Sequence, residues 1–332
     1  MPNIVTFDAV GGADVLKVVD APARDPAPGE VRLSLSSIGL NRAEILYREG
    51  LYFQTPQFPG CRIGLEGVGR VDAVGEGVTG INEGDRFVTG PTNTMAQTGV
   101  YGQTVTVGAE HLLPDIPQFT DDELAALWVA YLTCYGPFVE IAGLQKGDYV
   151  LIAAASSSVG YAGIQIAKAL GAHPIATSRT RAKEAALLEA GAEAVIPTDE
   201  AADLTAALME PTGGAGYRLI FDPIGGAIVE PMAAALALNG HYVLYGLLDP
   251  NPTVYPTLLS FVKHMHFHTF MVPTQGIADR AMRDKGTAFL ARAVANGHLK
   301  PKLDRIFELQ DVRAAHTYME SNQQNGKIVM RA

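Results

Sequence analysis

Residues 149–171 read YVLIAAASSSVGYAGIQIAKALG, and this stretch decides the expected fold. Its first part, residues 149–155, is a continuous apolar run, which is typical of a parallel strand covered on both faces. Residues 159–170 repeat apolar side chains at helical spacing, and Gly171 follows where helices commonly end. The stretch therefore predicts a buried strand, a serine-rich turn and a helix.

The same alternation of strand and helix continues along the chain. Short apolar runs predict further strands at residues 174–177, 194–197, 219–222 and 241–245. Helical spacing between them predicts helices at residues 181–190, 201–209 and 228–238. Such alternation is typical of right-handed βαβ units on one parallel sheet. We therefore expect an α/β protein with a doubly wound Rossmann domain over residues 122–265.

The two ends of the chain differ from this middle part. Residues 30–40 alternate apolar and polar side chains, and glycine recurs too often in residues 60–90 for a helix, so both segments favour strands. The pattern changes at Thr120, which is followed by acidic residues suited to the first turn of a helix. We expect residues 1–121 and 266–332 to form a second, β-rich domain. Its later part is predicted to hold a helix at 279–295 and a strand at 327–330.

The serine-rich turn lies where doubly wound domains bind dinucleotide phosphates. It comprises Ser156, Ser157, Ser158 and Val159, and serine stands where glycine is usual. Serine is small enough for close backbone approach, and its hydroxyl can bond a phosphate oxygen, but it is less free than glycine at positive φ. We interpret the turn as a cofactor-binding site.

A rival interpretation uses the same turn. A small-x-Ser-x-small pattern between strand and helix also fits a nucleophile elbow, which would make Ser158 the nucleophile of a hydrolase. Asp222 and either His264 or His316 follow in the order that such a triad requires. The β-rich first third of the chain has no place in this interpretation, and we favour the nucleotide site.

The end of the second predicted strand favours NADPH over NADH. Enzymes that use NAD usually carry Asp or Glu about 20 residues after the phosphate-binding turn, where it bonds the ribose 2′-hydroxyl. Residues 177–183 read TSRTRAK, a segment rich in bases and without an acid. A 2′-phosphate suits Ser178, Arg179 and Lys183, whereas cations at the start of a helix would otherwise oppose its dipole.

The composition excludes several classes of function. The 35 acidic residues outnumber the 25 basic ones, and a net charge of −10 argues against nucleic-acid binding. The opening MPNIVTFDAVGG lacks the features of a signal peptide, and the apolar stretch 124–139 is too short to span a membrane. The two cysteines, Cys61 and Cys134, are too few for a disulfide scaffold or a cysteine-based structural zinc site. We expect a soluble, cytoplasmic protein with neither membrane nor nucleic acid as partner.

Several segments combine into the pattern of a known family. They are residues 31–41 (VRLSLSSIGLN), 50–52 (GLY), 64–69 (GLEGVG), 84–86 (GDR), 132–133 (LT), 150–160, 163–171 and 326–329 (GKIV). In order and spacing they resemble the zinc-lacking quinone oxidoreductase-like branch of the medium-chain dehydrogenase/reductase superfamily over nearly the whole chain. The resemblance implies a GroES-like catalytic domain, a Rossmann domain and an active-site cleft between them.

The resemblance also bears on metal binding. Relatives with catalytic zinc carry Cys where this chain has Asn41 and His where it has Leu65. The lobe with closely spaced cysteines that holds a structural zinc in some relatives is missing. Glu66 remains, but one carboxylate is not a metal site, and we interpret it as a structural carboxylate. We expect no metal.

Three alternating histidines form one other candidate metal site. A strand would place His264, His266 and His268 on one face, and three imidazoles can bind zinc. We favour a strand edge or a subunit interface there instead. The resemblance implies a homodimer, because relatives commonly extend the Rossmann sheet across a two-fold axis.

The chemistry expected without a metal is reduction of an activated acceptor. Zinc would stabilise the alkoxide in alcohol oxidation, and a Tyr-x3-Lys pair that could replace it is absent from the sequence. A quinone or an α,β-unsaturated carbonyl compound absorbs the hydride's charge itself and needs only a proton donor. By resemblance, Tyr52 is the candidate donor and Asn41 a hydrogen-bonding residue of the cleft; Tyr52 could instead be a packing residue and Asn41 a turn residue. Tyr47 departs from what some relatives place there.

The remaining cofactor contacts rest on the resemblance alone. They are Thr133 near a phosphate, Tyr245 and Gly246 along the cofactor, Phe270 at the carboxamide, and Asn322 and Lys327 near the 2′-phosphate. Each could instead be a packing or surface residue. Two other functions stay open: a zinc-independent alcohol dehydrogenase, and a protein that binds NADPH without turnover.

Overall fold

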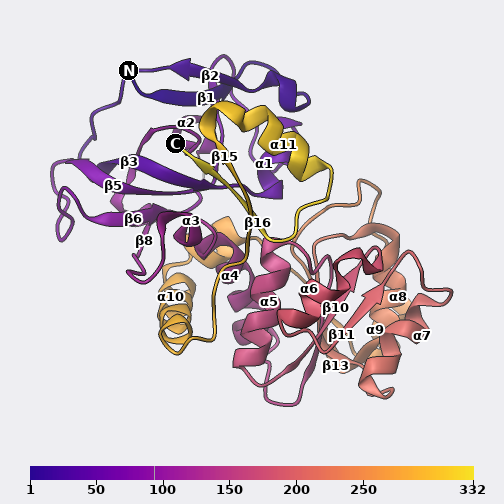
Figure 1. Ribbon diagram of the computed structural model, residues 1–332. Coiled ribbons are helices and arrows are strands. Elements are labelled where there is room, and N and C mark those ends of the chain that lie inside the picture. The colour runs from indigo at the N-terminus through magenta and orange to yellow at the C-terminus, as the bar shows by residue number, and fades with distance from the viewer. Residues whose placement is uncertain (93) are drawn as a thin grey trace. The chain divides into compact units, whose positions relative to one another are not determined.

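The computed structural model describes residues 1–92 and 94–332, which form two compact units (Figure 1). Unit 1 comprises Met1–Val129 and Pro301–Ala332, and unit 2 comprises Ala130–Lys300. The sequence predicts boundaries at residues 121 and 266, whereas unit 2 begins later, at Ala130, and extends further toward the C-terminus, to Lys300. This extension arises because the strand His266–Thr269 joins the sheet of unit 2 and the helix after it packs there, with Phe289 against Tyr135 at a ring distance of 5.4 Å.

Unit 2 is built on a parallel sheet with the strand order β11-β10-β9-β12-β13-β14. The strands are β9 (Tyr149–Ile152), β10 (His173–Ser178), β11 (Ala194–Pro197), β12 (Tyr217–Asp222), β13 (Leu236–Leu244) and β14 (His266–Thr269). The order reverses between β9 and β12, which makes this the switch point at which doubly wound domains bind ligands. The predicted doubly wound parallel sheet is confirmed.

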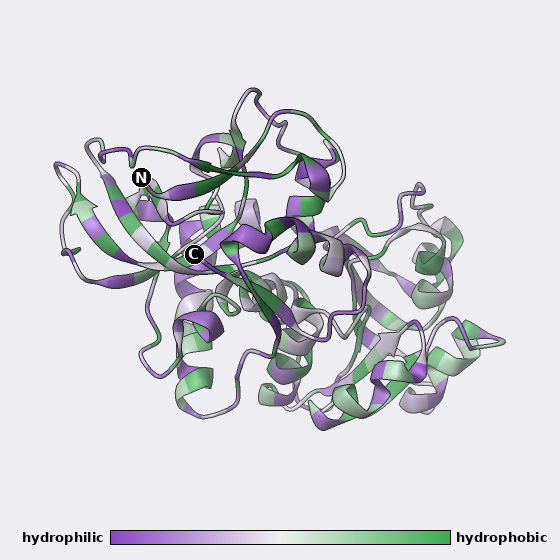
Figure 2. Ribbon diagram, turned by 45° about the horizontal axis from the view of Figure 1, so that its top comes forward, coloured by the Kyte–Doolittle hydropathy of each residue, from purple (hydrophilic) through white to green (hydrophobic). Residues whose placement is uncertain are grey.

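Helices connect and follow these strands. They are α5 (Ser158–Ala169), α6 (Glu184–Glu189), α7 (Leu204–Met209), α8 (Val229–Ala234), α9 (Thr257–Lys263) and α10 (Arg280–Ala295). Figure 2 shows helices banded in green and purple, as expected when one face packs on a core and the other meets solvent. The core of unit 2 includes Leu151, Ile175, Ile220, Met232 and Tyr242, all buried.

Three helices of unit 2 are shorter than predicted. Residues 181–183 form a 3₁₀ turn, so the α-helix predicted at 181–190 begins at Glu184. The helix predicted at 201–209 begins only at Leu204, because the side chain of Asp203 accepts a hydrogen bond from Ala206 N and caps the helix there. The helix predicted at 228–238 ends at Ala234, because Leu236 already pairs with β12 opposite Tyr217. Strand β13 then bulges, and Asn239 adopts a positive φ of 59° within it.

Unit 1 is β-rich, as predicted. One antiparallel sheet has the order β2-β1-β4, and a larger sheet has the order β15-β16-β3-β5-β6-β8, with β7 also pairing with β3. The strands are β1 (Asn3–Phe7), β2 (Lys17–Asp20), β3 (Glu30–Gly39), β4 (Cys61–Arg62), β5 (Glu66–Val74), β6 (Arg86–Thr89), β7 (Thr104–Gly108) and β8 (Leu112–Leu113). The short helices α1 (Arg42–Arg48), α2 (Met95–Thr98) and α3 (Asp121–Leu124) lie between or after them, and α4 (Trp128–Tyr135) leads into unit 2.

The C-terminal segment completes unit 1. It comprises β15 (Leu303–Glu308), α11 (Val312–Glu320) and β16 (Lys327–Arg331), drawn in yellow among the indigo and purple elements of Figure 1. Strand β16 pairs antiparallel with β3, with Val329 opposite Gly39. The strand predicted at 327–330 is therefore confirmed, and it brings the last residues of the chain beside residue 40.

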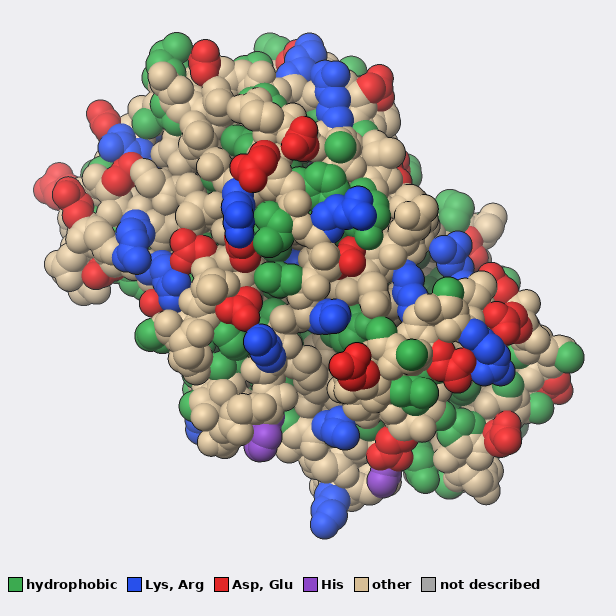
Figure 3. Space-filling view, viewed as in Figure 1, with side chains coloured by type: hydrophobic (Ala, Val, Ile, Leu, Met, Phe, Trp, Pro, Cys, Tyr) green, Lys and Arg blue, Asp and Glu red, His purple; other side chains and the backbone are tan. Residues whose placement is uncertain are grey.

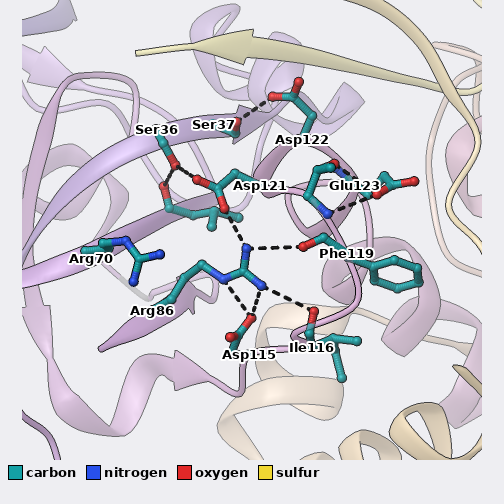
Figure 4. A network of polar contacts seen from close by, with 12 residues as sticks. Ser36, Ser37, Arg70, Arg86, Asp115, Ile116, Phe119, Asp121, Asp122 and Glu123 are labelled. Carbon is teal, nitrogen blue, oxygen red and sulfur yellow. Dashed lines mark hydrogen bonds and ion pairs between the residues drawn. The ribbon is translucent and has the colours of Figure 1, made fainter. Parts of the chain in front are cut away.

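The predicted helix start at Thr120 is confirmed and fixed by a polar network (Figure 4). Thr120 and Glu123 form a capping box, in which Glu123 N donates to the Thr120 hydroxyl at 3.3 Å. Asp121 accepts from Arg86 at 2.7 Å and from the Ser36 hydroxyl at 2.6 Å. Although burial opposes it, these bonds lower the pKa of Asp121. The network ties the helix start to β3 and β6.

The helical run Asp121–Ile141 is long and apolar enough to cross a membrane by length and composition. Its most apolar window is 83% buried within the protein. A mostly buried run of this kind is what a core helix of a soluble protein shows.

Candidate cofactor and active site

The serine-rich turn lies at the carboxyl end of β9, beside the switch point. Ala154 adopts a positive φ of 48°, and Ser157 caps α5 by accepting a hydrogen bond from Gly160 N at 3.0 Å. A Cβ on Gly160 would lie 2.3 Å from Ala155 O, so only glycine allows this helix to start so close to its strand. Backbone N–H groups in a first helical turn lack intrahelical acceptors, and the turn can offer them to a phosphate.

The basic residues predicted for a 2′-phosphate fall on the same side of the sheet. Ser178 ends β10, Arg179 follows it in an exposed position, and Lys183 donates to the Ser156 hydroxyl at 3.3 Å. Lys183 therefore links the start of α6 to the phosphate turn. The charge of Arg181 is already neutralised, because Arg181 pairs with Glu184 at 3.0 Å and with Glu200 at 3.4 Å.

The far side of the switch point is lined by the ends of β12 and β13. Tyr245 stacks on Phe221 with ring centroids 3.9 Å apart. Its buried hydroxyl lies near the Ser157 side chain of the turn but makes no hydrogen bond of good geometry among the described residues, which suits a position that meets a ligand. A Cβ on Gly246 would lie 2.8 Å from Pro223 O, so the backbone passes unusually close at this point. The turn, Lys183 and the Tyr245 hydroxyl beside Ser157 together fit a dinucleotide.

The hydrolase interpretation does not fit this geometry. The Asp222 carboxylate is buried and accepts from the Tyr242 hydroxyl at 2.7 Å and from Ile224 N at 2.7 Å. In the described part of the chain, no histidine hydrogen-bonds to it. His264 ends α9 with a positive φ of 48°, and His316 belongs to a buried cluster of unit 1. Ser158 thus has no Asp–His pair.

Two other predicted contacts of unit 2 are buried. Thr133 lies on α4 at 5% exposure. Phe270 follows β14, and its N–H donates to Leu244 O at 3.0 Å. Only its carbonyl could therefore serve a carboxamide. A Cβ on Gly136 would lie 2.5 Å from the Phe270 ring, which shows how tightly this ring is enclosed.

In unit 1, the predicted residues Asn41 and Lys327 belong to one buried polar cluster. Lys327 forms an ion pair with Glu66, and both side chains are almost fully inaccessible to solvent. Its ammonium also donates to Asn41 Oδ1 at 2.8 Å, while Asn41 Nδ2 donates to Glu66 Oε1 at 3.1 Å. In this structure the charge of Lys327 is neutralised by Glu66, so the contact with a 2′-phosphate stays a prediction. Glu66 is structural, as expected.

A neighbouring carboxylate was missed by sequence reasoning. Glu44 is fully buried, and it accepts hydrogen bonds from Asn41 N at 2.7 Å, Leu65 N at 2.9 Å and the Tyr101 hydroxyl. Burial raises the pKa of Glu44 to about 7, against the effect of these bonds and of the charge on Lys327. The only sequence signal was the Asn-x-x-Glu spacing, which resembles a capping box.

The cluster continues from Tyr101 to the helix α11. His316 Nε2 lies 3.2 Å from the Tyr101 hydroxyl, and Arg48 Nη1 lies 3.1 Å from His316 Nδ1. Because Arg48 can only donate, Nδ1 must accept, and the proton of His316 then sits on Nε2. Burial, with the charge of Arg48, lowers the pKa of His316 to about 3, so this imidazole is neutral. Arg48 in turn pairs with Glu320.

Tyr52 is partly buried and contacts Tyr47 edge-on at a ring distance of 6.3 Å. Burial, and then the charge of Glu44, raise the pKa of Tyr52, so its phenol keeps its proton over the usual pH range. Within the residues that the structure describes, no protein group hydrogen-bonds to this hydroxyl. Tyr47 differs: it is fully buried, and its hydroxyl lies 3.0 Å from Cys61 Sγ, which makes it a core residue.

Asn322 also lies in unit 1, just after α11, with a positive φ of 58°. Its side chain accepts from Arg42 and donates to Glu320 O at 3.1 Å. It therefore helps to end the helix, a role that asparagine fills because it tolerates the left-handed region.

The histidines lie differently from the expectation. His266 and His268 share a face of β14, but the third ring on that face is His241 of β13 instead of His264. His241 Nδ1 and His268 Nε2 are 3.1 Å apart, and burial lowers the pKa of His241 to about 4. Residues 1–92 and 94–332 hold no group of histidine, cysteine or acidic side chains arranged to bind a metal ion.

Comparison with known proteins gives one family match within each of the two units. A zinc-binding dehydrogenase family model matches residues 158–284, and an alcohol dehydrogenase GroES-like domain model matches residues 27–118. Quinone oxidoreductase 1 of Escherichia coli is 30% identical over 334 residues, 99% of each chain. A 2-haloacrylate reductase of a Burkholderia species is 29% identical over 96% of each chain. The structure of E. coli quinone oxidoreductase complexed with NADPH has a TM-score of 0.91 at 28% identity, covering 99% of this chain and 100% of that one.

Proposed function

The chain belongs to the quinone oxidoreductase-like branch of the medium-chain dehydrogenase/reductase superfamily, and on this premise we propose that it reduces quinones or α,β-unsaturated carbonyl compounds with NADPH. The observation that carries the proposal is the turn between β9 and α5, with Lys183 bonded to Ser156 and the buried Tyr245 hydroxyl beside Ser157. These groups fit a dinucleotide, and Arg179 supplies further positive charge for a 2′-phosphate.

When bound, NADPH would supply the hydride that reduces the acceptor. The residues of unit 2 hold the nucleotide: the first-turn N–H groups of α5 bind phosphate, and Ser178, Arg179 and Lys183 bind the 2′-phosphate. Thr133, Ser157, Ser158, Val159, Gly246 and the Phe270 carbonyl complete the proposed site. The tyrosine and asparagine of unit 1, Tyr52 and Asn41, are proposed as proton donor and polar contact to the substrate carbonyl.

The contacts of Asn41, Lys327 and Glu66 are the reason for proposing a conjugated acceptor. Asn41 Oδ1 is held by the Lys327 ammonium, and Glu66 is neutralised by the same lysine. Neither Asn41 nor the neutralised Glu66 is a strong base for an alcohol proton. Tyr52 holds its proton, which suits donation to an enolate or a quinol oxygen after hydride arrival. Both the quinone and the 2-haloacrylate relatives act on electron-poor acceptors by name.

A homodimer is part of the proposal. Strand β14 ends the sheet of unit 2, and α9 beside it exposes Leu258 at 76%, Phe261 at 76% and Val262 at 65%. Apolar side chains of this size in one helix favour a partner surface. The face in view in Figure 3 intermixes acidic and basic side chains, which favours neither nucleic acid nor an anionic membrane as partner. We propose a soluble protein of the cytoplasm.

The test is oxidation of NADPH followed by absorbance at the nicotinamide band. Purified protein is mixed with NADPH or NADH and with a benzoquinone, a cyclic enone, a crotonyl thioester or a simple ketone. We expect turnover with the quinone or the enone, faster with NADPH and unchanged by a chelator. Turnover with the ketone instead would identify an alcohol dehydrogenase. Tight NADPH binding without any turnover would identify a binding protein and contradict the proposal.

A further inference from the structure

A small cavity in unit 1 is lined by apolar residues together with basic and polar side chains that the proposed reaction does not use. It has a volume of about 60 Å³, and its lining includes Arg24, Arg62, Gln97, Thr104 and Thr106. Arg62 lies on β4, Thr104 and Thr106 on β7, and Gln97 on α2. One water takes up roughly 30 Å³ in the liquid, so the cavity has room for a small ion or about two waters.

Arg62 is a half-buried cation whose Nε is enclosed, and it has no counter-ion among the described residues. Its Nη2 donates to Thr104 O at 3.0 Å, but its Nε is enclosed and has no hydrogen-bond partner in the described residues. No carboxylate of the described chain pairs with it. Burial, with the charge of Arg24, lowers the pKa of Arg62 to about 10, which still leaves the guanidinium charged. A charge largely enclosed by protein is normally paired, because removing it from water without a partner is disfavoured.

A second unpartnered group points to the same place. The Thr104 hydroxyl is buried and makes no hydrogen bond to any described residue. It can donate one hydrogen bond, as the Arg62 Nε–H can. Arg24 adds positive charge nearby, although its own guanidinium is held by Glu30 through bonds of 2.7 and 2.8 Å. The residues around the cavity thus include two unused donors, the Arg62 Nε–H and the Thr104 hydroxyl, and carry a net positive charge.

We propose that this cavity is a binding site for a small monovalent anion of the size of chloride. The anion accepts hydrogen bonds from Arg62 Nε and the Thr104 hydroxyl and neutralises the Arg62 charge. Bound there, it joins β4 to β7 and stabilises unit 1. The site is independent of the proposed reductase activity, and its test does not require turnover.

The first experiment measures thermal unfolding of the full-length protein at constant ionic strength while chloride replaces methanesulfonate, an anion too large for the cavity. An ion that binds only the folded state raises the unfolding temperature progressively above its dissociation constant. We expect such a rise with chloride and bromide. Equal unfolding temperatures in both salts at every chloride concentration would overturn the proposal.

Substitutions of the cavity residues test whether the chloride dependence of the unfolding temperature arises at this cavity. Thr104→Val removes one donor while keeping the shape, and we expect it to raise the chloride concentration of half-effect about fivefold, the value of roughly one hydrogen bond. Arg62→Met should abolish the chloride dependence. The control is Arg70→Met, an exposed arginine of β5, which should leave it unchanged. A chloride effect that survives unchanged in Thr104→Val places the ion elsewhere and contradicts the assignment.

A crystal grown or soaked in bromide decides the case even where Arg62→Met does not fold. We expect an anomalous bromide peak within hydrogen-bond distance of Arg62 Nε and Thr104 Oγ1. Water at that position, with no anomalous signal, would show that solvent and not an anion satisfies the two donors.

Discussion

Glu44 is a buried carboxyl group of unit 1 whose raised pKa makes protein stability depend on pH. Its ordinary pKa of 4.5 rises to about 7 because burial disfavours the carboxylate. Between these two values the folded protein holds a proton that the unfolded chain has released. The free energy of unfolding therefore falls as pH rises through this window, and the contribution of Glu44 to stability is fully present only below the lower value.

Replacing Glu44 by Gln should remove this dependence. Relative to the parent protein, Glu44→Gln should become more stable by about 2 kcal/mol between pH 5 and pH 8. The measurement is urea unfolding of both proteins across that range. His316 has a pKa of about 3 in the folded protein and acts with the opposite sign, losing stability as pH falls from its ordinary 6.5, but it is present in both proteins and cancels. The exposed Glu83→Gln is the control, and a parallel pH response of Glu44→Gln and the parent would contradict the prediction.

Tyr52 tests the catalytic proposal most directly. Tyr52→Phe removes the hydroxyl and keeps the ring that packs edge-on against Tyr47. A positioned general acid contributes about 100-fold or more, so we expect kcat to fall by about that factor while the NADPH dissociation constant stays unchanged. Steady-state kinetics and nucleotide fluorescence give the two values. Tyr255→Phe, in an exposed tyrosine of unit 2, is the matched control. An unchanged kcat in Tyr52→Phe excludes it as the donor.

At individual positions, the sequence predicted the local role of a residue better than it predicted which residues contact it. Asn41 and Lys327 are distant in sequence, and nothing in either local pattern indicates that their side chains are 2.8 Å apart. The contact follows from β16 pairing with β3, a long-range feature of the sheet. The resemblance implies a phosphate near Lys327. In the structure, the Lys327 ammonium instead pairs with the buried Glu66 carboxylate, which requires a cation.

Among the elements, those with a continuous period could be predicted, and those interrupted by tertiary pairing could not. Strand β11 was predicted with its bounds, and β3 and α5 to within one residue. Residues 235–240 misled the prediction, because helical spacing continues there while the chain already pairs with β12. Asn239, one residue after the predicted end of that helix, lies in the bulged part of β13 with a positive φ. Pairing with a neighbouring strand overrode local propensity at this point.

The turn after β10 gives the prediction that belongs to the element scale. Arg179 is exposed and Arg181 is tied to Glu184 and Glu200, although both lie in one short basic segment. Arg179→Ala should therefore weaken NADPH binding about tenfold, the value of one charge-assisted contact, and leave NADH binding unchanged. Arg181→Ala is the matched control and should leave the NADPH to NADH preference intact. Fluorescence titration of both nucleotides measures it, and an equal loss for the two nucleotides in Arg179→Ala would argue against a 2′-phosphate contact.

At the scale of the whole molecule, the division into two units was predictable, but the place of residues 266–300 was not. The alternation of strand and helix ends near residue 265 in the sequence, because β14 is short and rich in histidine instead of apolar residues. Its pairing with β13 nevertheless adds it to the sheet of unit 2. A strand at the edge of a sheet does not need the apolar run that identifies a central parallel strand.

The same edge supports the prediction of a homodimer. β14 leaves one row of backbone N–H and C=O groups unpaired in the described sheet, and edge strands of this kind pair readily with another chain. On α9, Leu258 and Phe261 are each 76% exposed, and placing a charge on either would oppose burial in an interface. We expect the parent protein to sediment as a dimer and Phe261→Glu to shift it to monomer at micromolar concentration, as measured by analytical ultracentrifugation. Leu188→Glu, at an exposed leucine of α6, should stay dimeric. A monomeric parent protein would contradict the prediction, while a dimer that persists in Phe261→Glu would place the interface away from α9.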